Sequence, residues 1–347
     1  MNAFMRHEAE ALSLSTPYLL FLGDIDQPSY AKTAFGLVDW APDLCVGEWS
    51  TAEGAVSAGL ARMDPAEARS RGARSLVIGV ANPGGVIPDT WVAALVEALD
   101  AGLDIVSGLH RPLSSIPELE EAARRGGRRL VDIRVPPKNI PVGTGRKRSG
   151  KRVLTVGTDC ALGKKYTAIA LHRALLARGV DADFRATGQT GIMIAGKGIP
   201  MDAVISDFEA GAAEVLSPDA AADHWDVIEG QGSLFNPSFA AVSLGLLHGS
   251  QPDVFVVCHD PTRKEIIGVE GFPVPSVEEV IDLTMRLGSL TNPKIRCGGV
   301  SLNTSSFDEG EAARIMKAES DRLHGLPVAD PMRGGRLFER LVDSCLA

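Results

Sequence analysis

A glycine-rich turn followed by a lysine is the first pattern in this sequence that could do chemistry. Residues 155–171 read TVGTDCALGKKYTAIAL, in which an apolar run passes through Gly157 to Gly163-Lys164 and then to a helical pattern. Backbone N–H groups of such a turn and of the helix start attract phosphate oxygens, and the lysine adds a positive charge. The pattern therefore predicts a phosphate-binding loop between a strand and a helix.

This loop departs from the usual GxxxxGK[ST] pattern in two ways. Five residues, TDCAL, separate Gly157 from Gly163, one more than the pattern has. Lys165 stands where a Ser or Thr hydroxyl normally binds Mg²⁺, and Thr167, two residues further along the helix, faces another direction. The loop is thus expected to bind phosphates, whereas the missing hydroxyl argues against nucleotide hydrolysis.

The composition is that of a globular protein without a general affinity for polyanions. The chain has 347 residues, of which 45% are hydrophobic, and its formal net charge of -9 repels nucleic acids and anionic membranes. No apolar run approaches the ~20 residues that span a bilayer, and the first residues lack the basic start and long apolar core of a signal peptide. We expect a cytoplasmic protein with a small-molecule substrate and with neither nucleic-acid nor membrane partners.

The cysteines predict neither a disulfide framework nor a zinc site. Their number is odd and no two have CxxC spacing, which favours a reducing cytoplasm. The five positions are Cys45, Cys160, Cys258, Cys297 and Cys345.

Short apolar runs alternate with helical patterns along the chain, which predicts an α/β protein with mostly parallel sheets. In the first half, strands are predicted over 18–24, 75–81, 103–109 and 130–136, and helices over 89–102 and 117–127. In the second half, strands are predicted over 152–158, 182–187, 225–232, 253–260, 295–303 and 326–330, and helices over 163–178, 276–290 and 308–325, with GQTGIM (188–193) as a loop.

A basic, Pro- and Gly-rich segment separates the two halves and predicts a domain boundary. We expect a Rossmann-like N-terminal domain over residues 1–140, a linker over 141–152 and a phosphate-loop domain over 153–347. The linker is expected to be solvated; a basic clamp near a phosphate ligand is the alternative. Its basic residues are Arg146, Lys147, Arg148, Lys151 and Arg152.

Three motifs in order resemble dethiobiotin synthetase and its P-loop NTPase relatives. They are the GTD turn with its GK pair, VIEGQGSL (227–234) and GGVSLNT (298–304). The resemblance implies a dethiobiotin-synthetase-like P-loop domain, in which Asn303 matches a base-recognising residue. It also keeps open an ATP- and Mg²⁺-dependent ligase or kinase as an alternative function.

Nearly the whole chain resembles a narrower family more closely, the D-glutamate N-acetyltransferases. The motifs that carry the resemblance are NPGGVIPDTW (82–91), GLDIVSGLH (102–110), GTDCALGK (157–164), TGQTGIMIAGKGIP (187–200), EGQGSLFNPSF (229–239), CHDPTRKEIIGV (258–269) and GGVSLNTS (298–305). The resemblance implies transfer of an acetyl group from acetyl-CoA to the amine of D-glutamate. This reaction needs no metal, and a loop without its metal ligand could hold the phosphates of CoA. P-loop relatives of this type also suggest a homo-oligomer.

Acetyl transfer to an amine needs a base that works near neutral pH, and three residues are candidates. Glu229 and His259 each end a predicted strand, where open α/β sheets bind ligands, but a tethering carboxylate and a structural histidine are the alternatives. Asp159 lies inside the loop, where a carboxylate beside phosphates is unfavourable unless it faces a cation or the amine. A turn-forming role is its alternative.

Further residues are candidates for binding the two reactants. Arg263 could hold a glutamate carboxylate, Gln189 could donate to it or to the oxyanion, and His110 would place the pocket between the domains. Solvated, turn-forming or structural roles are the alternatives. For the CoA phosphates and base we expect Gly157, Thr158, Asp159, Cys160, Gly163, Lys164, Lys165, Tyr166 and Asn303. Cys160 could also carry an acyl group, although a packing role is favoured. A non-catalytic nucleotide-binding switch is a third class of function.

Overall fold

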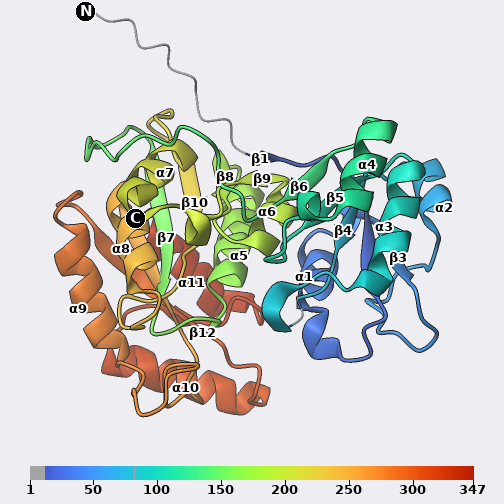
Figure 1. Cartoon of the computed structure of the whole chain (residues 1–347). Coiled ribbons are helices and arrows are strands. Elements are labelled where there is room, and N and C mark those ends of the chain that lie inside the picture. The colour runs from blue at the N-terminus through green and yellow to red at the C-terminus, as the bar shows by residue number, and fades with distance from the viewer. Residues whose placement is uncertain (1–11, 82) are drawn as a thin grey trace, which may run out of the picture. The chain divides into compact units, whose positions relative to one another are not determined.

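The computed structural model describes residues 12–81 and 83–347, which form two compact units. The first unit contains residues 12–137 and Gln189–Ala203, and the second contains Lys138–Gly188 and Val204–Ala347. Each unit is built on its own parallel sheet (Figure 1). None of the described helices is long and apolar enough to cross a membrane.

The first unit has a five-stranded parallel sheet in the order β3-β2-β4-β5-β6, which is the flavodoxin-like variant of the doubly wound folds to which Rossmann folds belong. Helices α2, α3 and α4 pack together beside it, and α1 packs on α6. The strands are β2 (Tyr18–Gly23), β3 (Cys45–Ser50), β4 (Ser75–Ile78), β5 (Asp104–Ser107) and β6 (Leu130–Asp132), with β1 (Leu12–Ser13) antiparallel to β9 (Lys197–Gly198). The helices are α1 (Lys32–Trp40), α2 (Pro65–Ser70), α3 (Asp89–Asp100), α4 (Pro117–Gly126) and α6 (Gln189–Ala195).

The second unit has a six-stranded parallel sheet in the order β13-β12-β11-β7-β10-β8. Helices α5 and α11 pack on one another and on this sheet, and α8 and α9 form a second pair against it. The strands are β7 (Lys151–Gly157), β8 (Ala182–Arg185), β10 (Trp225–Ile228), β11 (Val254–His259), β12 (Arg296–Leu302) and β13 (Val328–Ala329). The helices are α5 (Lys164–Ala177), α7 (Glu209–Leu216), α8 (Ala240–Ser250), α9 (Val277–Gly288), α10 (Glu309–Arg322) and α11 (Gly335–Leu346).

The predicted α/β class with parallel sheets is confirmed, and every predicted strand and helix forms with shifted ends. The helix predicted to stop at a glycine does so, because Gly127 adopts the left-handed conformation (φ 60°) that closes α4. The predicted loop GQTGIM is wrong, since α6 begins at Gln189. Its segment, Gln189–Ala203, joins the first unit although it lies within the range 153–347, because Met193 accepts a hydrogen bond from Tyr18 and β9 pairs with β1.

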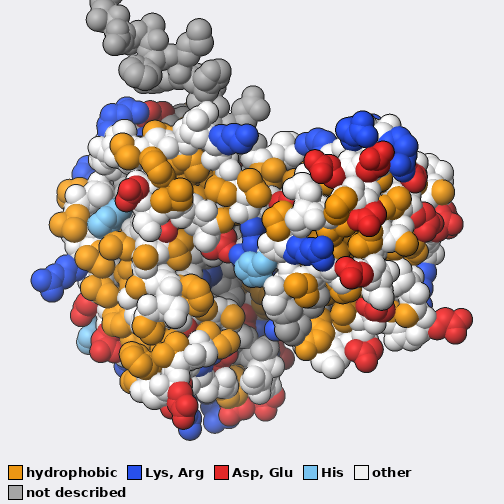
Figure 2. Space-filling view, in the orientation of Figure 1, with side chains coloured by type: hydrophobic (Ala, Val, Ile, Leu, Met, Phe, Trp, Pro, Cys, Tyr) orange, Lys and Arg blue, Asp and Glu red, His pale blue; other side chains and the backbone are white. Residues whose placement is uncertain are grey.

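The prediction of a solvated basic linker is wrong for Arg148 and Arg152, which are buried. Arg148 donates to the carbonyl oxygens of Ser217 (2.6 Å) and Gly249 (2.7 Å), and Arg152 donates to Ser217 Oγ (2.6 Å). The two guanidinium groups therefore fasten the start of β7 to the segment between α7 and β10. The surface charges are mixed: Figure 2 shows acidic and basic side chains interspersed on the visible face of each unit.

Candidate functional site

Three neighbouring strands of the second unit bring the predicted chemistry to one edge of the sheet. β7 lies between β11 and β10 in the sheet. Thr158 follows the carboxyl end of β7, His259 is the last residue of β11, and Glu229 follows β10. The chain leaves β7 toward β10 and β8 and later returns to β11 on its other side, so β7 and β11 form the switch point of the sheet. Such a point opens a crevice at the carboxyl ends of the strands, where ligands bind in open α/β folds.

Lys164 crosses the phosphate loop instead of extending into solvent. Its side chain is buried, and its Nζ donates to the carbonyl oxygen of Asp159 at 2.7 Å. Glycines make room for it, because a Cβ on Gly157 would lie 3.3 Å from Lys164 Nζ and one on Gly230 would lie 3.2 Å from Lys164 Cδ. Burial lowers the pKa of Lys164. The loop is thus built around this ammonium group.

Asp159 fastens the phosphate loop to two other loops. Its Oδ1 accepts from Asn236 Nδ2 (3.0 Å), and its Oδ2 accepts from Arg263 Nη1 (3.1 Å) and from the Ile267 amide (2.7 Å). Burial alone would raise the pKa of Asp159, but these hydrogen bonds leave it below its usual value. Its carboxylate is therefore ionised and engaged on both oxygens, which suits a structural clamp better than a base.

Exchanging Asp159 for asparagine separates those two roles. Asp159→Asn keeps the shape but removes the charge that holds Arg263, so we expect a several-fold higher KM for the phosphate-bearing substrate with kcat nearly unchanged. Steady-state kinetics measure both constants. A large fall in kcat at saturating substrates would instead support the prediction that Asp159 is a base.

Glu229 follows β10 and is almost fully buried, with 4% of its surface exposed. Its Oε2 accepts from the backbone amides of Thr187 (2.9 Å) and Gly188 (3.0 Å). Burial raises the pKa of Glu229, while these amides and the charges of Lys165 and Lys164 act in the opposite direction. One carboxylate thus orders the loop after β8, and the positive charges of Lys164 and Lys165 favour its ionised form.

His259 ends β11 and is half-buried. Its Nδ1 lies 3.0 Å from Thr158 Oγ1, and the Thr158 amide donates to the Cys258 carbonyl oxygen at 3.1 Å. Burial lowers the pKa of His259, only partly offset by Glu319 and Asp260, so the imidazole is neutral at pH 7. A neutral ring held at one nitrogen beside a phosphate loop has the state and the support that a general base needs.

The remaining loop residues differ in their chemical state. Cys160 is a thiol whose pKa is raised, chiefly by burial, and its sulfur lies 3.6 Å from Asn236 Nδ2. This raised pKa disfavours an acyl-carrying thiolate and agrees with the favoured packing role. Lys165 Nζ lies 4.8 Å from the centre of the Tyr166 ring. Thr167 faces away from the loop as expected, since its hydroxyl contacts Ser301 Oγ at 2.8 Å.

Two further predicted residues of this unit have clear partners. Arg263 Nη1 donates to Asp159 Oδ2 and, at 2.8 Å, to the Cys160 carbonyl oxygen. These hydrogen bonds hold the phosphate loop with one nitrogen of the guanidinium group. Asn303 follows β12. Its backbone N–H donates to the His259 carbonyl oxygen at 2.9 Å, and its side-chain Oδ1 accepts from the Ser305 backbone N–H. Their roles toward glutamate and the base of CoA stay predictions.

His110 and Gln189 belong to the first unit, whereas the phosphate loop belongs to the second. His110 is exposed and follows β5, and Gln189 Nε2 donates to Asp202 Oδ2 at 2.9 Å. Asp202 also pairs with Arg134 (2.6 Å). The sequence reasoning missed Arg134, Asp202 and Asn236, although Asn236 lies within the motif EGQGSLFNPSF, where an Asn-Pro pair signals a turn.

A small hollow of about 20 Å³ adjoins the phosphate loop in the second unit. Its polar edge includes Gly157, Gly230 and Gln231, and its wall is largely aliphatic. The aliphatic side chains are Leu154, Val156, Leu234, Leu246, Leu247 and Val280. A space of this size holds about one water molecule.

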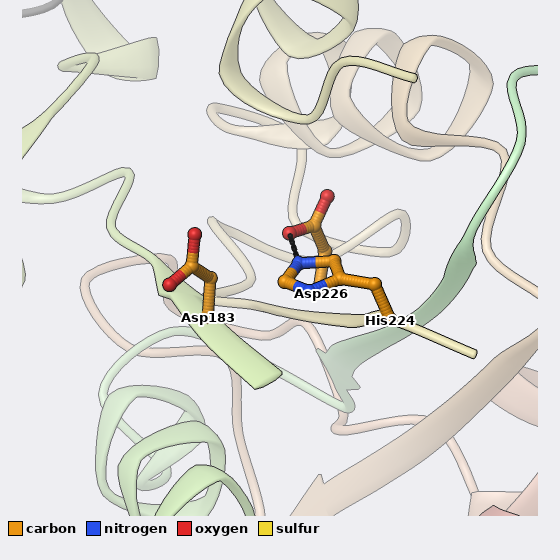
Figure 3. Close-up of side chains that lie close together, drawn as sticks. All are labelled: Asp183, His224 and Asp226. Atoms are coloured by element: carbon orange, nitrogen blue, oxygen red, sulfur yellow. Dashed lines mark hydrogen bonds and ion pairs between the residues drawn. The ribbon is translucent and has the colours of Figure 1, made fainter. Parts of the chain in front are cut away.

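Among the described residues, one acidic and histidine cluster has the spacing of a metal site: Asp183, His224 and Asp226 (Figure 3). Arg185 already pairs with Asp183 (2.9 Å) and Asp226 (2.6 Å), and Ser217 Oγ donates to Asp226 at 2.5 Å. A guanidinium between the carboxylates supplies the charge that a cation would bring. The cluster is therefore part of the ion-pair network around the start of β7, and it carries no metal-site proposal.

Comparison with known proteins agrees with this architecture. The P-loop domain of the DUF1611 family matches residues 141–342, and its Rossmann-like domain matches residues 45–136. A protein named D-glutamate N-acetyltransferase from Tritonibacter scottomollicae is 48% identical over 334 residues, covering 96% of this chain and 99% of the relative. A second one, from a Pseudoalteromonas species, is 46% identical over 336 residues, covering 97% and 99%.

A solved structure extends the comparison to three dimensions. The crystal structure of a DUF1611 family protein from Anabaena variabilis is 33% identical, with a TM-score of 0.81, and the match covers 96% of this chain and 99% of that one. Relatives of this length and identity confirm the resemblance stated from the motifs. The chain belongs to the DUF1611 family, with its Rossmann-like and P-loop domains, and is a full-length relative of two D-glutamate N-acetyltransferases.

Proposed function

We propose that this protein is an acyltransferase that moves an acetyl group from acetyl-CoA to the amino group of D-glutamate. The observation that carries the proposal is the full-length relationship to two enzymes of that name, at 48% and 46% identity. A fold-level likeness would not suffice, because P-loop folds host many reactions. Here the identity extends over both units.

The phosphate loop is the proposed site for the CoA phosphates. Its support is the buried Lys164, the glycines that accommodate it and the positive helix start of α5, which together attract an anion. Asn303 would then contact the base, as its motif implies.

His259 is the proposed base, in preference to Glu229. The imidazole is half-buried, neutral at pH 7 and held by Thr158, so a substrate can reach it in its proton-accepting state. Glu229 is nearly enclosed, and its Oε2 is already held by two amides. Its proposed role is to position the loop after β8 and to balance the charge of Lys164 and Lys165.

The reaction balances with one proton released. The substrate ammonium gives a proton to His259, its nitrogen attacks the thioester carbonyl carbon, and a tetrahedral oxyanion forms. Collapse breaks the C–S bond, the sulfur leaves with the electron pair, and the second nitrogen proton ends on the thiol. Backbone amides of the phosphate loop are the candidate oxyanion donors, and the role of Gln189 as a donor stays a prediction. Arg263 and His110 stay predicted contacts of the amino acid, and a cytoplasmic homo-oligomer stays a prediction.

The test is a thiol-release assay with acetyl-CoA and D-glutamate, with L-glutamate as the paired substrate. We expect thiol release with D-glutamate and little with L-glutamate. The rival ligase or kinase predicts no thiol, but ADP release from ATP in the presence of Mg²⁺. ADP formation that EDTA abolishes, without thiol release, would favour the rival.

A further inference from the structure

Polar groups from four segments meet where strands β5 and β6 of the first unit end. Gly108 directly follows β5, and Arg134 lies two residues after β6. Arg134 Nε donates to the Gly108 carbonyl oxygen at 3.0 Å, and its Nη1 donates to Asp202 Oδ2 at 2.6 Å. Gln189 Nε2 donates to the same Asp202 oxygen at 2.9 Å. Because β5 and β6 are parallel neighbours, this network lies at the carboxyl edge of the sheet, where open α/β folds bind ligands.

The pair of Arg134 and Asp202 is held in place and is still accessible. Two segments fix the guanidinium group, and a third fixes the carboxylate through Gln189. A Cβ on Gly108 would lie only 3.3 Å from the Cβ of Gln189, so the missing side chain lets these segments approach closely. The side chains of Arg134 and Asp202 are 29% and 30% exposed, which leaves both within reach of a small molecule.

Both charged side chains keep hydrogen-bonding capacity that no described residue uses. A guanidinium group has five N–H groups, and within the described part of the chain only Nε and Nη1 of Arg134 have acceptors, whereas Nη2 has none. Asp202 Oδ2 accepts two hydrogen bonds, while its Oδ1 accepts none from the residues that the structure describes. The pair thus offers donors beside an acceptor, and its two charges cancel.

An α-amino acid has the complementary arrangement of charges. Its carboxylate and its ammonium group are attached to one carbon, so a single molecule can accept from Arg134 and donate to Asp202. A simple anion would gain less, because the charge of Arg134 is already balanced by Asp202. Arginine is also well suited to binding a carboxylate through its planar set of donors.

We propose that Arg134 and Asp202 bind the head group of the amino-acid substrate, with the carboxylate on Arg134 Nη2 and the ammonium group on Asp202 Oδ1. That the amino acid is D-glutamate rests on the proposed function, whereas recognition of an α-amino acid head group does not. Asp202 uses one of the three N–H groups of the ammonium and leaves the others for the base. Gly108 and Gln189 are positioning residues, which act by holding the pair.

Titration of the full-length protein by saturation-transfer NMR, with and without CoA, tests the proposal with three ligands. D-glutamate has both charged groups on one carbon, 4-aminobutyrate lacks the α-carboxylate, and glutarate lacks the ammonium group. Arg134→Met should weaken binding of D-glutamate and glutarate roughly 10- to 100-fold, the effect of losing a charge-assisted hydrogen bond, without weakening that of 4-aminobutyrate. Asp202→Asn should weaken binding of D-glutamate and 4-aminobutyrate without weakening that of glutarate.

Two further variants separate recognition from folding. Arg134→Lys retains the charge and should recover part of the affinity for D-glutamate. Arg125→Met removes the exposed partner of Asp100 (2.7 Å) in the same unit and should leave the Kd of every ligand unchanged. Thermal denaturation verifies the fold of each variant. Equal losses for all three ligands, wild-type affinity in Arg134→Met, or no binding of D-glutamate with or without CoA would overturn the proposal.

These outcomes are independent of turnover. The crossed pattern of losses in a protein that does not acetylate D-glutamate would keep this inference and reject the acetyltransferase function. Acetylation of D-glutamate with an unchanged KM in Arg134→Met and Asp202→Asn would do the reverse.

Discussion

Replacing His259 with alanine is expected to lower kcat about 10²- to 10⁴-fold while the protein stays folded. The reason is that, in the proposed mechanism, the half-buried, neutral imidazole accepts the proton of the substrate ammonium, and alanine offers no acceptor. Its partner Thr158 contacts Nδ1 and leaves the other ring nitrogen for the substrate. Steady-state kinetics with acetyl-CoA and D-glutamate measure the effect, and circular dichroism checks the fold.

The pH dependence gives this prediction a second readout. The base acts in its neutral form, and burial moves the pKa of His259 below its usual value of about 6.5. Activity should therefore persist at neutral pH and fall as the pH drops through this lowered pKa. In His259→Ala that acid limb should disappear from the residual rate.

Two matched variants separate His259 from the other candidates. His248→Ala removes a histidine whose Nε2 contacts the Leu287 carbonyl oxygen, away from the strand ends, and should keep most activity. Glu229→Gln keeps an acceptor oxygen for the Thr187 and Gly188 amides and should affect KM for CoA more than kcat. Loss of kcat in Glu229→Gln with normal kcat in His259→Ala would reverse the assignment of the base.

Replacing Arg152 with methionine is expected to lower the free energy of unfolding by about 3–5 kcal/mol. The guanidinium is fully buried and donates to Ser217 Oγ (2.6 Å) and to the carbonyl oxygens of Arg148 (3.1 Å) and Pro218 (2.9 Å). Methionine fills the space but leaves these acceptors unpaired and removes a cation beside the buried Asp226. Urea denaturation measures the loss.

Arg146 in the same basic segment is the matched control. It is exposed and pairs with Asp219 at 2.6 Å, an interaction that solvent weakens. Arg146→Met should change stability by less than about 1 kcal/mol. Equal stability losses in the two variants would contradict the distinction between the buried and the solvated part of this segment.

The sequence predicted the sheets well because strand and helix signals are local. Runs such as VFVVCH and SLVI are apolar throughout, as buried parallel strands are. Helix α6 was missed because Gly188 before it, Gly191 within it and its polar start indicate a loop. The unit that its segment joins is decided by the contact of α6 with α1 and by the pairing of β9 with β1, which the sequence does not show. Arg148 and Arg152 were expected in solvent because arginine is usually exposed. Their acceptors come from residues about 65–100 positions away.

In the candidate site, too, contacts between residues that are distant in the sequence could not be predicted. Glycine spacing and strand ends were enough to select the loop, Glu229 and His259, since the carboxyl ends of adjacent parallel strands meet at one edge. The role of Asp159 was not predictable, because Asn236, Arg263 and Ile267 reach it from two distant loops. Lys165 was visible as a departure from the motif, but its contact with the Tyr166 ring required the fold.

We propose that the phosphate loop presents acetyl-CoA, without metal, to the amine of D-glutamate. The most direct test is simultaneous measurement of free thiol and of N-acetyl-D-glutamate by mass spectrometry, with acetyl-CoA and D-glutamate in EDTA. We predict that the two products appear in equal amounts and that added Mg²⁺ leaves the rate unchanged. No N-acetyl-D-glutamate, or its formation only with ATP and Mg²⁺, would contradict the account.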